Sequence, residues 1–208
     1  ADSAEHMELY IAIKAGAPGF NIVMVAGEVQ TTFGPGSDFA VVPEAERITD
    51  EPKVDFWRGS YIETNTAFTV PADGLYHVVI DTEYKKIVIA PVVWGVIGAA
   101  TPAGWGGSTP MPATGFDLNS MTFEETDVVM TKADFKFRYS DGWKIVLDTT
   151  NDNGALDPGV RVNTNFGGAV DALVPGGDNI SNTVPGKYTI QMMWSLTGGT
   201  TASLTKTA

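Results

Sequence analysis

Two segments of the chain share an order of residues that limits the possible folds more than any other feature. Residues 68–80 read FTVPADGLYHVVI, and residues 182–190 read NTVPGKYTI. Both place Val-Pro and then Gly ahead of a Tyr that opens a long strand, and both precede a second strand suited to a hairpin. A repeat of this kind indicates two related β units in tandem.

The front ends of the two halves show a looser echo. Residues 9–20 read LYIAIKAGAPGF, and residues 94–105 read WGVIGAATPAGW. The repeat places a boundary near Pro91, so we expect an N-terminal domain over residues 1–91 and a C-terminal domain over residues 92–208. Each has the size of an all-β sandwich, and the first is either a second binding unit or a spacer.

The strand signals are short and local throughout. Residues 75–81 and 85–90 are predicted to form one hairpin, and residues 187–196 alternate before a Gly-Gly turn. Residues 134–139 (DFKFRY) alternate strictly, so their aromatic side chains share one face. The Asp-Gly turn that follows them predicts a return strand over residues 143–148. We therefore expect an all-β fold of two tandem β-sandwich domains.

In two other segments the pattern is either interrupted or open to two interpretations. Residues 121–124 and 128–130 are predicted as two separate short strands. Residues 43–50 (PEAERITD) are either one helical turn with Pro at its start or a charged loop.

The composition restricts the partners. The formal net charge is −12, which repels phosphate backbones, so we expect no nucleic-acid partner. The chain has no Cys, which excludes disulfides, thiolate nucleophiles and Cys-ligated metals. No stretch approaches the ~20 consecutive apolar residues of a membrane span, and the opening ADSAEH is not a signal peptide. Membrane attachment is expected only through a lipid anchor that this chain does not contain.

The second unit resembles a known family on several short motifs in order. These are WGVIGAATPAGW at its start, then Pro-Met, the FKF strand at residues 135–137, a Trp after the next turn, and VPGKYTI near its end. In this order they resemble the SusE/SusF starch-binding outer-membrane proteins of Bacteroidetes glycan-uptake systems. The resemblance covers most of residues 93–208 and, more weakly, residues 1–91. It implies tandem immunoglobulin-like carbohydrate-binding modules, without catalysis or cofactor, on a cell-surface lipoprotein.

The resemblance also implies a site. Carried over by motif, the aromatic platform is Trp105 and Trp143, with Lys136 as a hydrogen-bond donor and Asn165 as another. The ligand would be an oligosaccharide or polysaccharide, starch-like or of another kind, and other glycan-uptake proteins would be partners. In the first unit the position of Trp105 holds Phe20, and the FKF strand has no clear match.

The residues themselves fit a sugar site but also allow other interpretations. The apolar face of a pyranose packs on an aromatic ring, and its hydroxyls need donors such as Lys, Arg and Asn. Trp105 lies among glycines and prolines, where a ring is either presented to solvent or caps one end of the core. Trp143 is either exposed at a turn or opens an inward face, and the Lys136 face of its strand is otherwise a solvated one. With the aromatics in the core, the chain would instead be a structural or adhesion module that binds another protein.

Metal and catalytic sites find weaker support. Residues 148–157 (DTTNDNGALD) are rich in oxygen ligands, but Thr149 stands at the first position of an EF-hand-like loop and no Glu closes it. We expect an Asx-rich turn there and no metal. His6 and His77 belong to no recognisable triad, and no carboxylate pair forms a glycosidase motif. We therefore expect no enzyme.

Overall fold

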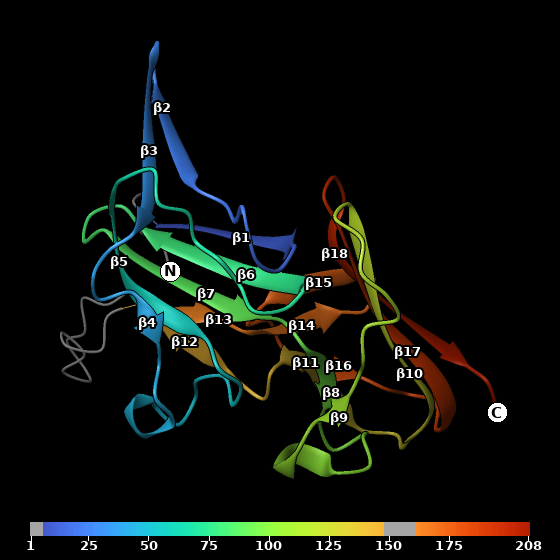
Figure 1. Ribbon diagram of the computed structural model, residues 1–208. Coiled ribbons are helices and arrows are strands. Elements are labelled where there is room, and N and C mark those ends of the chain that lie inside the picture. The colour runs from blue at the N-terminus through green and yellow to red at the C-terminus, as the bar shows by residue number, and fades with distance from the viewer. Residues whose placement is uncertain (1–5, 148–160) are drawn as a thin grey trace. The chain divides into compact units, whose positions relative to one another are not determined.

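The chain folds almost entirely into β-strands. The computed structural model describes residues 6–147 and 161–208 (Figure 1). Its strands form curled antiparallel sheets consistent with a β-sandwich, which confirms the all-β class predicted from the sequence. Helical structure is confined to the two 3-10 turns η1 (Glu44–Glu46) and η2 (Gly104–Gly106) in this part of the chain. No helix among these residues is long and apolar enough to cross a bilayer.

The described residues divide into two compact units. The chain leaves unit 1 at Pro91 and enters unit 2 at Val92. Two segments are exchanged, however. Ile48–Val54 belongs to unit 2, whereas residues 146–147 and 161–162 belong to unit 1. Neither unit is therefore one continuous stretch of sequence.

Unit 1 is built on a single seven-stranded sheet. Its order is β1-β6-β7-β5-β3-β2, and β4 pairs with β5. The central hairpin β6–β7 is the one predicted from the sequence. The β2–β3 hairpin stands away from the other strands in Figure 1. The strands are β1 (His6–Ile13), β2 (Ile22–Ala26), β3 (Val29–Pro35), β4 (Ala40–Val41), β5 (Trp57–Glu63), β6 (Gly74–Asp81) and β7 (Lys86–Pro91).

The curl of this sheet encloses the main core of unit 1. Alternation places Tyr76, Val78 and Ile80 of β6 on the inner face, with Ile87 and Ile89 of β7 beside them. The opposite face of β6 is buried too, since His77 and Val79 are not exposed at all. Part of that second face lies near residue 146, whose carbonyl accepts a hydrogen bond from the guanidinium of Arg58 at 2.8 Å. Burial on both faces explains why the apolar residues are consecutive over Val78–Ile80 of β6 and Ile87–Ala90 of β7.

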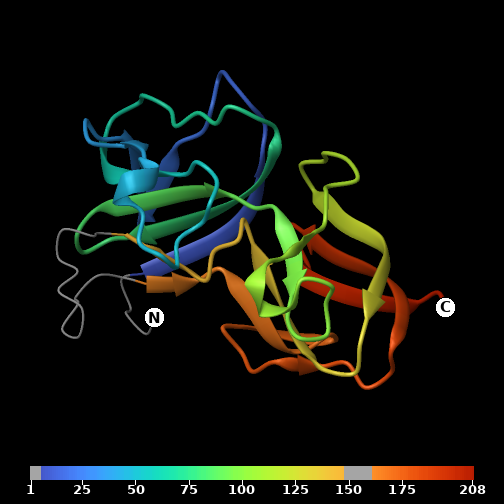
Figure 2. The same cartoon turned by 90° about the horizontal axis from the view of Figure 1, so that it is seen from below.

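Unit 2 has two main sheets. The first has the order β10-β17-β18, and the second has the order β15-β14-β11-β8-β9 with β16 on β11. In Figure 2 the yellow β10 lies beside the red β17–β18 pair. The strands that lie wholly in unit 2 are β8 (Trp94–Ile97), β9 (Thr109–Pro110), β10 (Ser120–Met130), β11 (Asp134–Tyr139), β14 (Asn165–Ala169), β15 (Ala172–Pro175), β16 (Ile180–Ser181), β17 (Gly186–Ser195) and β18 (Gly199–Lys206). Strands β12 (Lys144–Val146) and β13 (Arg161–Asn163) pair with each other, and each includes residues assigned to unit 1.

Alternation divides each main sheet of unit 2 into an inner and an outer face. On β11 the buried aromatic residues Phe135, Phe137 and Tyr139 take one face, as predicted, and Lys136 and Arg138 take the other. The inward Tyr139 ring meets Trp94 edge-on at 5.6 Å between ring centroids. On β17 the buried residues also alternate; they are Tyr188, Ile190, Met192 and Trp194. Trp94 and Trp194 are therefore core residues.

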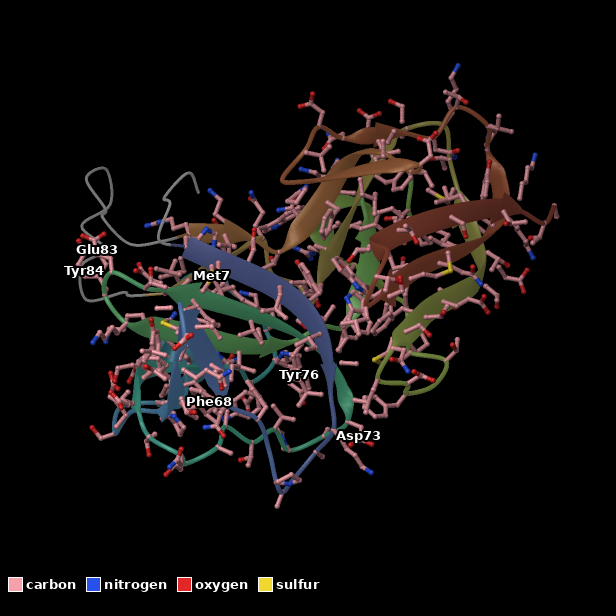
Figure 3. All side chains as sticks on the ribbon, turned by 90° about the horizontal axis from the view of Figure 1, so that it is seen from above. Met7, Phe68, Asp73, Tyr76, Glu83 and Tyr84 are labelled. Carbon is pink, nitrogen blue, oxygen red and sulfur yellow. The ribbon has the colours of Figure 1, made fainter. Side chains whose placement is uncertain are left out.

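The repeated Val-Pro…Tyr segments share one structural contact. The hydroxyl of Tyr76 donates to the carbonyl of Ala72 at 2.7 Å, and the hydroxyl of Tyr188 donates to the carbonyl of Val184 at 2.6 Å. Each Tyr thus reaches back four residues across the bend that opens its strand, the arrangement known as a tyrosine corner in β-sandwiches. Figure 3 labels Tyr76 at the start of β6 and Asp73 in the bend before it. The sequence repeat is therefore a repeat of structure.

Three local predictions need correction. The strand after the Asp-Gly turn is β12, but it pairs with β13 and not with β11, because β8 already occupies one edge of β11 and β14 and β16 share the other. The two short strands predicted over residues 121–130 are one strand, β10, with a bulge near Asp127 at φ 57°. The looser echo of the front ends fails in pairing, since β1 pairs with β6 whereas β8 pairs with β11 and β9.

Candidate functional site

Trp105 is presented on a tightly closed loop of unit 2. It is the middle residue of η2 and is 45% exposed. The loop is closed by backbone bonds, with Gly98 N–H donating to Gly104 O at 3.1 Å and Gly104 N–H donating to Thr101 O at 3.1 Å. Gly104 has φ 59°, a conformation that glycine takes without steric cost. The ring is therefore exposed on a backbone that is held in place.

Trp143 is half-buried and its backbone is fixed at both ends. Its N–H donates to Asp50 O at 2.7 Å. Its carbonyl accepts two bonds, from the N–H of Thr164 at 3.1 Å and from the side-chain amide of Asn165 at 3.0 Å. This network fixes the backbone that carries the Trp143 side chain.

The two indole rings lie against each other. Their centroids are 6.4 Å apart and their planes are inclined by 36°. The structure thus brings together the two residues that the sequence nominated for a platform, although they are 38 positions apart in sequence (143 − 105). The pair is angled, and its planes do not form one flat surface.

Arg138 lies against one ring of the pair, that of Trp143. Its guanidinium carbon lies 4.7 Å from the centroid of the Trp143 ring, a cation–π contact. Its Nε donates to Ser108 Oγ at 2.8 Å, and one terminal nitrogen donates to Asp141 at 2.9 Å. Burial lowers the pKa of Arg138 and Asp141 opposes that shift, yet an arginine stays charged in either case. A buried cation therefore lies on one side of the Trp143 ring.

A shallow pocket of about 230 Å³ opens beside this arginine. Its lining includes Gly95, Ser108, Arg138, Asp141 and Lys53. A side chain at Gly95 would fill the space, because a Cβ there would lie 2.9 Å from Ser108 Cβ and 3.0 Å from Thr109 O. Hydroxyl, carboxylate and cationic groups are thus available within the lining of one shallow depression.

The structure places Asn165 and Lys136, the two predicted hydrogen-bond donors, in different surroundings. Asn165 is only 4% exposed and its amide is engaged with Trp143, so it positions the platform from behind. Its Oδ1 is buried and has no hydrogen-bond partner in the described part of the chain. Lys136 is half-buried on the same face of β11 as Arg138. Burial lowers the pKa of Lys136, and the nearby charge of Asp178 opposes the shift.

The sequence did not single out three groups of this site: Arg138, Ser108 and Asp141. Arg138 could have been found, because strict alternation puts it on the Lys136 face and one step closer to the turn before Trp143. Ser108 and Asp141 carry no comparable signal, since polar residues are ordinary in loops and turns.

No group of three or more metal-ligating side chains gathers anywhere in the described ranges, 6–147 and 161–208. The oxygen-rich segment at residues 148–157 lies outside the described residues.

The chain is thus an all-β protein of two antiparallel units, one of which presents a supported tryptophan pair. No protein-family model matches the chain, and no curated protein matches it.

Proposed function

We propose that unit 2 binds a polysaccharide or oligosaccharide, without catalysis, on the platform formed by Trp105 and Trp143. The observation that carries this proposal is the adjacency of the two rings, 6.4 Å between centroids, with Trp105 45% exposed on a closed loop. Rigid aromatic area costs little conformational entropy when a ligand packs on it. An exposed Trp105 beside a half-buried Trp143 is suited to such packing.

Arg138 increases the suitability of the platform for a sugar. The C–H groups of a pyranose face carry partial positive charge and pack on the electron-rich face of an indole. The guanidinium beside Trp143 fixes that ring by a cation–π contact, so the ring need not be ordered when the ligand binds. The groups around the neighbouring pocket, Ser108, Asp141 and Lys53, are of the kind that sugar hydroxyls need.

The inclination of the rings favours a chain that curves. A flat ribbon of sugars would match coplanar rings, whereas planes inclined by 36° follow neighbouring sugars that turn relative to each other. Helical α-linked glucans have such a turn, which agrees with the starch-like ligand that the family resemblance implies. By the same resemblance, the proposal extends to a lipid-anchored protein at the bacterial outer-membrane surface, alongside other glycan-uptake proteins.

Affinity electrophoresis in gels that contain soluble polysaccharides tests the proposal. We expect retardation by at least one glycan, stronger with α-linked than with flat β-linked chains. Trp105→Ala and Trp143→Ala should each abolish most of the retardation. A matched control is Val129→Ala, since Val129 is also in unit 2 and 53% exposed but lies on β10.

Absence of retardation across a broad panel would refute sugar binding. In that case a structural or adhesion module that binds another protein becomes the better interpretation of the chain. Retardation that survives both tryptophan substitutions would instead refute the site. Release of shorter sugars from the same panel would refute the non-catalytic part of the proposal.

A further inference from the structure

Strand β2 is a sheet edge without the usual protection against pairing. It pairs only with β3 in the part of the chain that the structure describes. Its sequence IVMVA has no charge and no Pro, and its register with β3 has no bulge. Val23 is 50% exposed and Val25 is 65% exposed. An open, apolar, regular edge is a template for another strand.

Other edge strands carry protective features. On unit 1, the opposite edge strand β1 carries Glu8. On unit 2, β10 is bulged, β15 ends at Pro175, and β9 has only two residues, one of them Pro110. Strand β18 has Thr or Ser at half of its positions and carries Lys206. The absence of such a feature at β2 is therefore a property of that strand.

The backbone of β2 offers a defined set of hydrogen bonds. The β2–β3 hairpin closes with a two-residue turn, in which Gly27 has φ 62°, and Ala26 pairs with Val29 across it. The pair that flanks such a turn is hydrogen-bonded, and bonded and non-bonded pairs then alternate. Met24 therefore bonds to β3, and the N–H and C=O groups of Val23 and Val25 face the open edge.

We propose that two copies of this chain associate through antiparallel pairing of β2 with β2, with Met24 on the two-fold axis. In this register Val23 lies opposite the partner's Val25, and the two exchange both of their free backbone bonds. The same holds for Val25 and the partner's Val23, so the edge is self-complementary, as a two-fold interface requires. Cross-strand pairs of β-branched residues are favourable in sheets.

The self-complementary register points to a second copy as the occupant, and the local charges are compatible with it. The chain has a formal net charge of −12, but β2 is uncharged, so pairing β2 with β2 brings no like charges into contact. The nearest hairpin charge is Glu28, in the turn. In the proposed register the two Glu28 residues stand eight positions apart, roughly 27 Å at about 3.4 Å per residue. That exceeds the Debye length of about 8 Å at physiological salt, so their repulsion is screened.

The contact is small, and the dimer is therefore weak. Besides β2, exposed Ile62 on the neighbouring β5 lies on the same face as Val23 and Val25, because Ile62 pairs with Gly34 and Val23 pairs with Thr32. Interfaces of this size belong to the transient class. The association rests on β2 alone and does not depend on the tryptophan platform.

Sedimentation velocity of the whole chain between about 10 μM and 1 mM tests the proposal. We expect a reversible monomer–dimer equilibrium. The double variant Val23→Lys with Val25→Lys places like charges opposite each other and should weaken the dimer at least tenfold. The variant Val23→Glu with Val25→Lys places Glu opposite Lys in the same register and should retain most of the affinity. Both variants remove the same two apolar side chains, so they differ in the charges that the register places opposite each other and in net charge.

Each outcome decides the question. The double-lysine variant makes the chain less acidic, so general repulsion predicts tighter association, the reverse of the expected result. Adding lysines elsewhere, Val129→Lys with Val174→Lys, should leave the dimer unchanged, and unaltered thermal unfolding should show that all variants fold. A chain that stays monomeric to the highest concentration, or equal loss in both β2 variants, overturns the proposal. If the chain is monomeric, a strand of another protein becomes the better candidate to pair with the β2 edge.

Discussion

The two units place one aromatic residue of the repeated front segment in opposite environments. In unit 1, Phe20 is half-buried, packs on Phe68 at 5.5 Å between ring centroids and joins the core. In unit 2, Trp105 at the matching position is exposed and meets Trp143. The backbone explains the difference. Phe20 exchanges two hydrogen bonds with Phe68, whereas the loop that carries Trp105 bonds to itself between Gly98 and Gly104.

This difference shows what a repeat does and does not conserve. Both units keep the tyrosine corner and the hairpin that follows it, because these contacts form between residues close in sequence. The aromatic of the front segment has no such local partner. Its fate depends on which distant segment its loop meets, so one unit can use it for stability and the other for a surface.

The largest effect is expected from removing the aromatic ring at each of these two positions. Phe20→Ala removes part of an aromatic cluster and should lower the free energy of unfolding of unit 1 by about 2–3 kcal/mol, below the full range for a buried ring because Phe20 is half-buried. Trp105→Ala should cost less than about 1 kcal/mol in unit 2 while it abolishes glycan retardation. Urea unfolding followed separately in each unit measures both. Similar costs at the two positions would remove the contrast between them.

A second effect compares two of the arginines that lie over aromatic rings, one in each unit. Arg138→Lys loses the forked contacts to Ser108 and Asp141 and the flat stacking on Trp143. The expected cost is about 1.5 kcal/mol, at the low end for charged hydrogen bonds because the side chain of Asp141 is half exposed to solvent. Glycan retardation should fall with it.

Arg58→Lys is the matched control. Arg58 lies over Phe56 at 5.6 Å and donates to the carbonyl of Val146 in unit 1. The Arg58→Lys variant should destabilise unit 1 but leave glycan retardation intact. Equal losses of retardation in both variants would mean that arginine stacking acts on the general stability of the chain and not on the platform.

The third effect tests whether the two tyrosine corners contribute equally to the stability of their units. Tyr76→Phe and Tyr188→Phe each remove one hydroxyl that donates across the bend. Each should cost about 1 kcal/mol, since a carbonyl loses its partner. Thermal unfolding of the two variants gives the measurement. If only one of the two substitutions lowers stability, the repeated segments share a geometry but not its contribution to stability.

Prediction from sequence succeeded where structure is local. The β6–β7 and β17–β18 hairpins followed from alternation and turn residues, and so did the inward face of Phe135 and Phe137. It failed where strands compete for an edge. The Asp-Gly turn predicted a partner for β11, but β8 and β14 arrive from elsewhere in the sequence and occupy its edges. No local pattern records that competition.

The candidate site divides in the same way. Trp105 and Trp143 could be nominated because one lies in a glycine-rich loop and the other follows a turn, and the fold brings them together. The position of Asn165 behind Trp143 depends on how β14 pairs with β11. A buried amide and an exposed one look alike in sequence, so its positioning role could not be predicted.

The smallest effect concerns mild acid, to which the units should respond differently, since both histidines of the chain belong to unit 1. His77 is fully buried, stacks on Tyr10 at 4.2 Å and contacts Glu8 Oε2 at 3.0 Å through its Nε2. Burial lowers the pKa of His77 from its ordinary 6.5, and the hydrogen bond from His77 lowers the pKa of Glu8 from its ordinary 4.5. A neutral His77 therefore donates to an ionised Glu8.

The pKa shifts of His77 and Glu8 change the stability of unit 1 in the same direction. Below pH 6.5 the unfolded chain takes up a proton on His77 that the folded unit resists, and below pH 4.5 the same becomes true of Glu8, so unit 1 loses stability as the pH falls. Hydrogen exchange should show β6 and β7 amides losing protection between pH 6.5 and 4.5 faster than those of β17 and β18, after correction for intrinsic exchange rates. His77→Gln should flatten that slope even if it lowers stability at neutral pH. A slope that is equal in both units, or unchanged in His77→Gln, would show that His77 does not set the acid response that separates them.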